Sequence, residues 1–336
     1  MKEKMERILI IIGICGFWIF MFQGIDLAEA KDPDYPTKPV TFYIGYVAGG
    51  NTDVASRALT EATSKYLGQP FIPVNKTGAG GALAALSVMN GKSDGYTLGI
   101  NMASSVLIMP HTEECPYKDL SGFTLIMNCG KYTFPLIVRS DAPWKTWKEF
   151  IEWARQNPRA AKIGTTAARS MSPMGISMWK AEQKEKVEFT YIVYKGSAEV
   201  ISATLGGHIT MEASSIDPPR VQYLKDGKLR ILAYLTREKV PGYEKAPTFH
   251  EMYGFEPPNL MGIWSPKGMP DYVLEKLDDA FAKAVKEPSF VNVMNRMYTP
   301  VVYMNRAEVN RHVKEEFPKV GEIIKILRAE EAKEKK

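Results

Sequence analysis

The fold is decided by the stretch Pro39-Val-Thr-Phe-Tyr-Ile-Gly-Tyr-Val-Ala-Gly-Gly-Asn-Thr-Asp53. Apolar side chains at every second position from Val40 to Tyr46, with further apolar residues between them, predict a buried strand. Gly49-Gly50 predicts a sharp turn after it. Apolar residues at helical spacing follow over residues 54–66, and Asn51 or Thr52 is placed to cap that helix. The stretch therefore predicts a strand, a glycine-rich loop and a helix in direct succession.

The same alternation continues to residue 101. Residues 71–74 predict a second strand, Gly80-Gly81 opens a helix that runs to Met89, and residues 96–101 predict a third strand. Such a βαβαβ run builds a parallel sheet with right-handed crossovers, and its ligands bind where strands end and helices begin. We therefore expect a ligand site at the carboxyl edge of this sheet.

A second alternating block begins with a capping box at Thr146 and Glu149. Its predicted elements are the strands 162–166, 187–193 and 229–235 and the helices 147–156, 197–205 and one around Met178, followed by a helix over 273–285. Residues 120–138 and 250–264 flank the block and are the natural crossings between two lobes, so they are candidate hinges. The Glu/Lys-rich tail beyond Leu327 predicts a solvated, fraying end.

The first thirty residues have the features of an export signal. Three basic residues precede an uncharged run over residues 8–22, and Ala28-Glu29-Ala30 has the small-x-small form of a signal-peptidase site. Because a spanning helix needs about 20 apolar residues, a retained membrane anchor is the weaker alternative. Cys15 follows Ile14, where a lipoprotein site requires a small residue, so no lipid anchor is expected. We predict a periplasmic protein with a signal peptide over 1–30, cleaved after Ala30.

The composition is that of a folded soluble protein. The 336 residues are 45% hydrophobic and 24% charged, which suits two domains, and the net charge of +5 is too small and too dispersed for a nucleic-acid-binding surface. After cleavage only Cys115 and Cys129 remain, and one disulfide or two buried thiols are equally compatible with the sequence.

Two glycine-rich loops are suited to hold an anion. In residues 47–53 the glycines let a ligand approach the main chain, and the positive end of the following helix favours a carboxylate. A purely geometric role of the glycines is the alternative. Asp53 would repel an anion directly, which assigns it to stabilising the helix or ordering a bridging water. The second loop, residues 77–81, follows the same logic.

The motifs of cofactor, catalytic and metal sites are not fulfilled. Leu83 stands where a dinucleotide fingerprint requires its third glycine, and no Walker sequence occurs. Gly91-Lys-Ser-Asp-Gly95 matches a nucleophile elbow in letters, but a helix precedes Ser93 and a strand follows it, which is the reverse of the required order. The four His residues, 111, 208, 250 and 312, lack metal-ligand spacing. We expect no catalysis and no cofactor.

Two loops of the middle block are rich in hydroxyl donors, over residues 165–172 and 194–198. Both are placed to face a ligand cleft between the two predicted lobes. Arg169 and Lys195 are their cations, and a guanidinium matches a carboxylate well, although a solvated position is the alternative for each.

Several short motifs occur in a familiar order. They are the Ala-Gly-Gly turn of 39–52, Gly-Ala-Gly-Gly within 75–81, Asp94-Gly95-Tyr96-Thr97-Leu98, Tyr194-Lys195-Gly196-Ser197, Gly227-Lys228-Leu229-Arg230 and Ala246-Pro247-Thr248. From about residue 36 to 327 the chain resembles the TctC or Bug family of tripartite tricarboxylate transporter substrate-binding proteins.

The resemblance implies a fold and a function. The expected fold is α/β, a type II-like two-lobed periplasmic binding protein with a mainly parallel sheet flanked by helices in each lobe and the ligand cleft between them. Lobe 1 is expected over 31–130 plus 251–336 and lobe 2 over 131–250. The implied function is a monomeric receptor that captures a small carboxylated solute and delivers it to TctA/TctB-like membrane subunits, without catalysis or cofactor.

The resemblance also implies the ligand-binding residues. These are Ala48, Gly49, Gly50, Asn51, Thr52, Asp53, Gly78, Ala79, Gly80, Gly81, Ala103, Ser104, Thr165, Ser170, Lys195, Gly196, Ser197 and Asp217. Two departures stand out: Gly45 replaces a usual proline, and Arg169 stands where small residues are common. We hypothesise that Arg169 pairs with a distal carboxylate of the ligand.

Two other functions fit the same cleft. A ligand sensor for a membrane receptor would share the fold and the ligand. A periplasmic enzyme acting on a carboxylate is less compatible, because the loops carry no base–nucleophile pair or metal cluster. The identity of the ligand depends on a few donors and on cavity shape, which the sequence does not specify.

Overall fold

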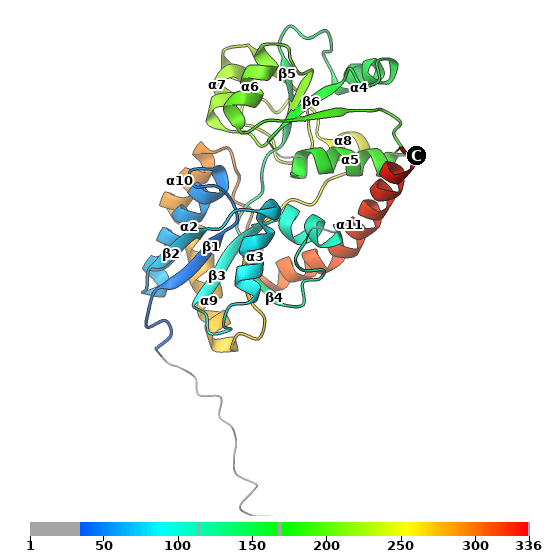
Figure 1. Cartoon of the computed structure of the whole chain (residues 1–336). Helices are drawn as coiled ribbons and strands as arrows, with labels where there is room; N and C mark the ends of the chain where they lie inside the picture. The colour runs from blue at the N-terminus through cyan, green and yellow to red at the C-terminus, as the bar shows by residue number, and fades with distance from the viewer. Residues whose placement is uncertain (1–33, 113–114, 167–169, 335–336) are drawn as a thin grey trace, which may run out of the picture. The chain divides into compact units, whose positions relative to one another are not determined.

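A computed structural model of the chain, drawn in Figure 1, describes residues 34–112, 115–166 and 170–334. From residue 36 onward its framework is two five-stranded sheets. The first has the strand order β2-β1-β3-β10-β4 and the second the order β7-β6-β8-β5-β9. The predicted signal segment and its cleavage site after Ala30 lie outside the described residues.

The strands and helices have the following bounds. The first sheet holds β1 (Val40–Ile44), β2 (Phe71–Asn75), β3 (Thr97–Met102), β4 (Phe123–Asn128) and β10 (Met261–Pro266). The second holds β5 (Pro135–Arg139), β6 (Lys162–Thr165), β7 (Thr190–Val193), β8 (Met211–Ala213) and β9 (Leu229–Tyr234). The helices are α2 (Asn51–Leu67), α3 (Ala82–Met89), α4 (Trp147–Gln156), α5 (Met171–Gln183), α6 (Ser197–Leu205), α7 (Pro218–Lys225), α8 (Phe249–Tyr253), α9 (Asp271–Ala284), α10 (Pro288–Arg296) and α11 (Arg306–Glu334).

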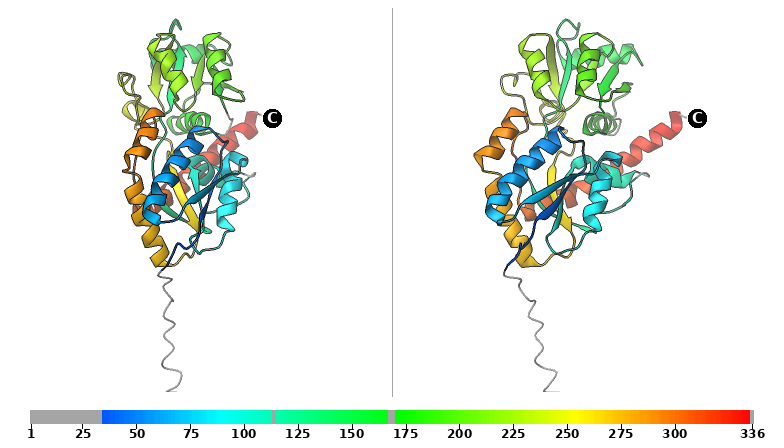
Figure 2. Two further views of the ribbon diagram at one scale, coloured as in Figure 1. Left: turned by 90° about the vertical axis from the view of Figure 1, so that its left-hand side faces the viewer. Right: turned by 60° about the vertical axis from the view of Figure 1, so that its left-hand side comes forward.

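The first sheet confirms the predicted βαβαβ run. β1 pairs in parallel with both β2 and β3, whereas β10 is antiparallel to β3 and β4. The connections through α2 and α3 move in opposite directions along the sheet, so right-handed crossovers put these helices on opposite faces. α9 and α10 pack beside α2 (Figures 1 and 2).

The second sheet repeats this plan. β6 pairs in parallel with β7 and β8, and β5 is antiparallel to β8 and β9. In each sheet the antiparallel strand is the first one that the chain enters after leaving the other sheet. The predicted α/β class with mainly parallel sheets is therefore confirmed, with one antiparallel strand in each.

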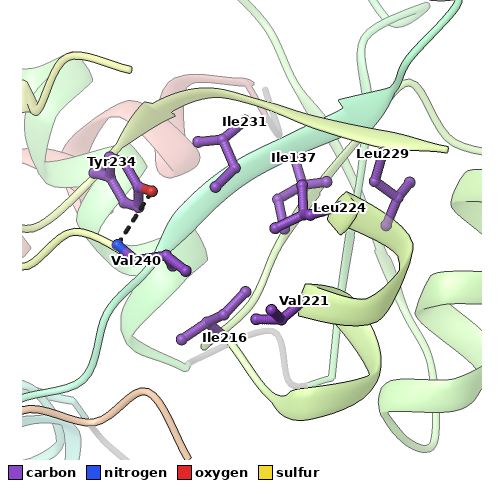
Figure 3. Packing of buried hydrophobic residues seen from close by; sticks show 8 residues of the cluster. All are labelled: Ile137, Ile216, Val221, Leu224, Leu229, Ile231, Tyr234 and Val240. Atoms are coloured by element: carbon purple, nitrogen blue, oxygen red, sulfur yellow. Dashed lines mark hydrogen bonds between the residues drawn. The ribbon is translucent and has the colours of Figure 1, made fainter. Parts of the chain in front are cut away.

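A compact apolar cluster fixes α7 against the second sheet. Val221 and Leu224 of α7 are almost fully buried and lie over Ile137 of β5, with Ile216 in the same cluster (Figure 3). Burying side chains of this size stabilises the fold by about 1.5–3 kcal/mol each. Because Val221 follows directly after the first turn of α7, this packing also fixes the position of that turn, which faces the cavity described below.

Two segments cross between the sheets and are tied to each other. Residues 129–134 join β4 to β5, and residues 254–260 lead from α8 to β10. The side-chain amide of Asn259 donates to the Tyr132 carbonyl at 2.7 Å and accepts from the Tyr132 backbone N–H at 3.1 Å. The crossings are shorter than the predicted segments, because β4 and β5 occupy 123–128 and 135–138 of the first, and α8 and β10 occupy 250–253 and 261–264 of the second. The lobe boundaries at 130 and 250 stay a prediction.

Some predicted boundaries were wrong. β1 ends at Ile44, so Tyr46 belongs to the loop, and Gly50 rather than Asn51 or Thr52 is the N-cap of α2. The tail beyond Leu327 was predicted to fray, but α11 continues to Glu334. α11 packs on β4 and on α5, and such contacts stabilise a helix whose terminal composition alone predicts a solvated end. Among the described residues, no helix combines the length and the apolar character needed to cross a bilayer.

Candidate functional site

A cavity of about 790 Å³ lies where the carboxyl ends of the parallel strands of both sheets meet. Its lining comes from three places. The first sheet contributes residues 45–47, 49–52, 77, 78, 80, 81 and 102–104, the second contributes 165, 166, 170–172, 195–197, 214, 215 and 217–220, and the crossings contribute 132, 134, 259 and 260. A volume of this size suits a small-molecule ligand.

Most of the predicted site residues lie together in this lining. They are Gly49, Gly50, Asn51, Thr52, Gly78, Gly80, Gly81, Ala103, Ser104, Thr165, Ser170, Lys195, Gly196, Ser197 and Asp217. Ala48, Asp53 and Ala79 are not among the lining residues. Arg169 lies outside the described residues, so its pairing with a distal carboxylate stays a hypothesis.

Asp53 holds the first glycine-rich loop in place from a position outside the cavity lining. Its side chain is only 4% exposed and accepts hydrogen bonds from the Gly49 backbone N–H at 2.9 Å, from Asn75 Nδ2 at 2.8 Å and from Arg57 Nε at 3.0 Å. Burial alone would raise the pKa of Asp53, but the bonds from Arg57, Gly49 and Asn75 outweigh it and hold the pKa below its usual value. The carboxylate therefore stays ionised and fixes the loop.

The two glycine-rich loops touch each other. A Cβ on Gly45 would lie 2.8 Å from the Gly81 Cα, a separation that real side chains do not show, so the close approach requires glycine. Gly78 and Gly81 have φ angles of 134° and 96°, which other residues rarely adopt. Tyr46, which sequence reasoning missed, lies against Gly81, with its hydroxyl 3.3 Å from the Gly80 carbonyl oxygen, to which it donates.

Four α-helix N-termini open onto the cavity without a side-chain cap. They belong to α2, α3, α5 and α6. The N-cap residues of these helices all line the cavity and make no side-chain capping bond, and they are Gly50, Gly81, Ser170 and Gly196. The first-turn N–H groups and the dipole of each helix favour a negative charge at its start. The start of α7 differs, because Asp217 caps it and Pro218 and Pro219 have no N–H.

The charged groups among the described lining residues all belong to the second sheet. They are Lys195, Asp217 and Arg220. Arg220 was not predicted, although Asp217 followed by two prolines is a helix-start signal that would have placed it in the first turn of α7. In the described part of the chain, no three His, Cys, Asp or Glu side chains are arranged to hold a metal ion.

The structure distinguishes between the disulfide and the two buried thiols that the sequence left open for Cys115 and Cys129. Cys115 and Cys129 are both buried and free. Burial raises the pKa of Cys129 to about 12, so its thiol is protonated at physiological pH.

Two α/β sheets whose parallel strands end at a shared cavity are characteristic of a solute-binding protein. The model of the family described as "Tripartite tricarboxylate transporter family receptor", TctC, matches residues 55–328, and the chain belongs to this family. It is a family of binding receptors rather than enzymes, as predicted.

Individual proteins agree with this assignment. A Cupriavidus necator protein described as "UPF0065 protein in gbd 5'region" is 34% identical over 301 residues, which cover 89% of this chain and 90% of that protein. A TctC solute-binding protein from Polaromonas, solved without ligand, is 29% identical with a TM-score of 0.73 and covers 87% of this chain and 99% of its own. A Rhodopseudomonas palustris protein solved with adipate is 25% identical with a TM-score of 0.72, at 87% and 98% coverage.

Proposed function

We propose that the protein captures a small carboxylate in this cavity and delivers it to a tripartite tricarboxylate-type membrane transporter. The observation that carries the proposal is the convergence of four helix N-termini without side-chain caps, those of α2, α3, α5 and α6, on one cavity. A carboxylate supplies the acceptor oxygens and the negative charge that these termini lack.

The solved relative with adipate supports the ligand class, because that protein has the same fold and holds a dicarboxylate. In the proposal, main-chain N–H groups of the first and second glycine-rich loops and of the loops at Ser170 and Gly196 hold the ligand. The predicted lining residues are its contacts, and Arg169 adds a partner for a distal carboxylate. If Arg169→Ala leaves the affinity for the ligand unchanged, that last role is refuted.

Export of the protein and cleavage of its signal peptide are part of the proposal. The export signal and the family support a periplasmic receptor that begins at Lys31 after cleavage and docks on TctA/TctB-like subunits, and the proposal takes this receptor to be a monomer. Mass spectrometry of the exported protein tests the cleavage site. A mature chain that retains the first 30 residues would contradict it.

A thermal-shift screen against mono-, di-, tri- and aromatic carboxylates tests the ligand class. A ligand at 100 times its dissociation constant stabilises the folded state by about 2.7 kcal/mol. For a chain of this size that is a rise in melting temperature of about 4 °C. The corresponding amides serve as uncharged controls, and flat curves for every acid would refute the carboxylate proposal.

The substitution Gly196→Asp separates binding from stability. Gly196 has an extended backbone, and a Cβ there meets nothing within 4 Å. An aspartate at this N-cap satisfies the helix start itself, so the unliganded protein should melt at the same temperature or slightly higher. The same carboxylate repels an acid in the cavity, and the ligand-induced shift should disappear.

The matched control is Ser202→Asp, which adds one negative charge to an exposed position in the middle of α6. It should leave the ligand-induced shift unchanged. Equal shifts in wild type and Gly196→Asp would contradict the role of the α6 N-terminus.

A further inference from the structure

The wall of the cavity at the start of α7 is built around one buried guanidinium. Arg220 is 2% exposed in its side chain and donates through Nε to Glu212 at 3.0 Å and through Nη1 to Ser197 Oγ at 2.6 Å and to Asp217. Ser197 Oγ in turn donates to Asp217, which also accepts from the Arg220 backbone N–H at 3.0 Å. The positions of Ser197 and Asp217 are therefore fixed before any ligand arrives.

This wall carries no surplus of positive charge. Arg220 is flanked by the Asp217 carboxylate on the cavity side and by Glu212 on the buried side, where burial raises the pKa of Glu212 and Arg220 opposes that rise. Asp217 remains 13% exposed and lines the cavity, so an additional carboxylate at this wall would lie next to a carboxylate. The wall is thus poorly suited to the acidic groups that the helix N-termini favour.

Two polar atoms of the same wall are left without partners. Ser214 Oγ and Arg220 Nη2 are buried and make no hydrogen bond within the described residues, and both residues line the cavity. A buried donor without a partner costs about 1–3 kcal/mol. A ligand group that reaches these buried atoms from the cavity and accepts from them recovers that energy.

A hydroxyl is the smallest common substituent that can both donate to Asp217 and accept from its unpartnered neighbours at a single atom. A hydroxyl donates to Asp217 and accepts from Ser214 or Arg220, an ammonium group only donates, and a carboxylate only accepts. We propose that Asp217, held by Arg220 and Ser197, and the hydroxyl of Ser214 recognise a hydroxyl group of the ligand, so that the protein selects a hydroxylated carboxylic acid. This inference rests on the proposed function, because it presupposes that an acid occupies the cavity.

Matched acids that differ at one carbon test the proposal. The probes are succinate, malate and aspartate, together with adipate, 2-hydroxyadipate and 2-aminoadipate, and the measurement is the dissociation constant by titration calorimetry. A hydrogen bond to a charged group contributes about 1.5–3 kcal/mol, so the hydroxy acid of at least one trio should bind about tenfold or more tightly than both its companions.

Two variants connect that preference to the wall. Asp217→Asn keeps a side chain that caps α7 and removes the charge, and Ser214→Ala removes a hydroxyl whose loss breaks no hydrogen bond within the described residues. Each should reduce the preference for the hydroxy acid at least threefold. The control Asp226→Asn makes the same charge change at the exposed other end of α7 and should leave the preference intact.

The outcomes separate this inference from the proposed function. Equal binding within both trios, preference for the amino acids, or an unchanged preference in Ser214→Ala and Asp217→Asn overturns the inference while acid binding stands. Failure of all six probes also overturns it, and the proposed function falls only if the wider carboxylate screen is flat as well.

Discussion

Replacing Asp53 by asparagine should destabilise the protein from a position outside the cavity lining. The carboxylate of Asp53 accepts from Gly49, Arg57 and Asn75 while its side chain is 4% exposed. Asparagine keeps one acceptor oxygen, but an amide NH2 replaces the other oxygen and then faces groups that are themselves hydrogen-bond donors. Losing one or two hydrogen bonds to a buried charge costs about 2–4 kcal/mol.

The assay is the melting temperature of wild type and Asp53→Asn as a function of pH. With an unfolding entropy of about 2.1 cal/mol/K per residue, this loss corresponds to a decrease of about 3–6 °C at pH 7. The pKa of Asp53 is lowered in the folded protein, so its stabilisation is present above the unfolded pKa of about 3.9 and is lost as the pH falls through the folded pKa. The difference between the two proteins should therefore be full near pH 7 and shrink below about pH 4.

The matched control is Asp279→Asn, which breaks another Asp–cation pair at i,i+4 spacing. Asp279 and Lys283 are exposed, so their pair contributes little and the melting temperature should barely change. The reasoning is refuted if Asp53→Asn melts with the wild type at pH 7, or if the difference at pH 3 is as large as at pH 7.

Three further predictions follow from packing and burial. Gly45→Ala forces a Cβ to 2.8 Å from Gly81, which should cost about 1–3 kcal/mol and weaken ligand binding, and an unchanged melting temperature would contradict this close approach. With no reductant added, Cys115 and Cys129 should react with Ellman's reagent only after unfolding, whereas an unfolded protein that does not react would contain a disulfide. Arg220→Met leaves buried carboxylates uncompensated and should lower the free energy of unfolding in urea by about 3–5 kcal/mol, and a value within 1 kcal/mol of wild type would exclude a structural role of the ion pair.

The parts of the site that the sequence predicted are those with local signals. The helix over 197–205 has the predicted bounds, and the helix over 147–156 begins as predicted, with Thr146 accepting from the Glu149 N–H at 3.2 Å. A cap or a glycine turn depends on a few neighbouring residues, so a single chain is enough to recognise it. The two glycine-rich loops could be placed at one cavity for the same reason.

The residues that sequence reasoning missed are brought to the site by tertiary packing. Arg220 reaches the cavity because Val221 and Leu224 anchor α7 on the second sheet. Tyr132 and Asn259 lie 127 positions apart and meet only where the two crossings run together. No local pattern encodes such pairings, since they depend on the register and order of strands that are distant in sequence.

The side chains of Asn51 and Thr52 change how the first loop must be understood. Both were predicted as ligand-binding residues, yet Asn51 Nδ2 donates to the Ile216 carbonyl at 3.3 Å, and the Thr52 hydroxyl is 2.7 Å from the hydroxyl of Tyr132. These bonds connect the start of α2 to the second sheet and to a crossing. The loop therefore offers an acid mainly its main-chain N–H groups, which are the same for every amino acid and distinguish little between one carboxylate and another. Under the proposed function, selectivity therefore depends on side chains elsewhere in the lining, among them Ser214 and Asp217, and Arg220 and Ser197 hold Asp217 in place.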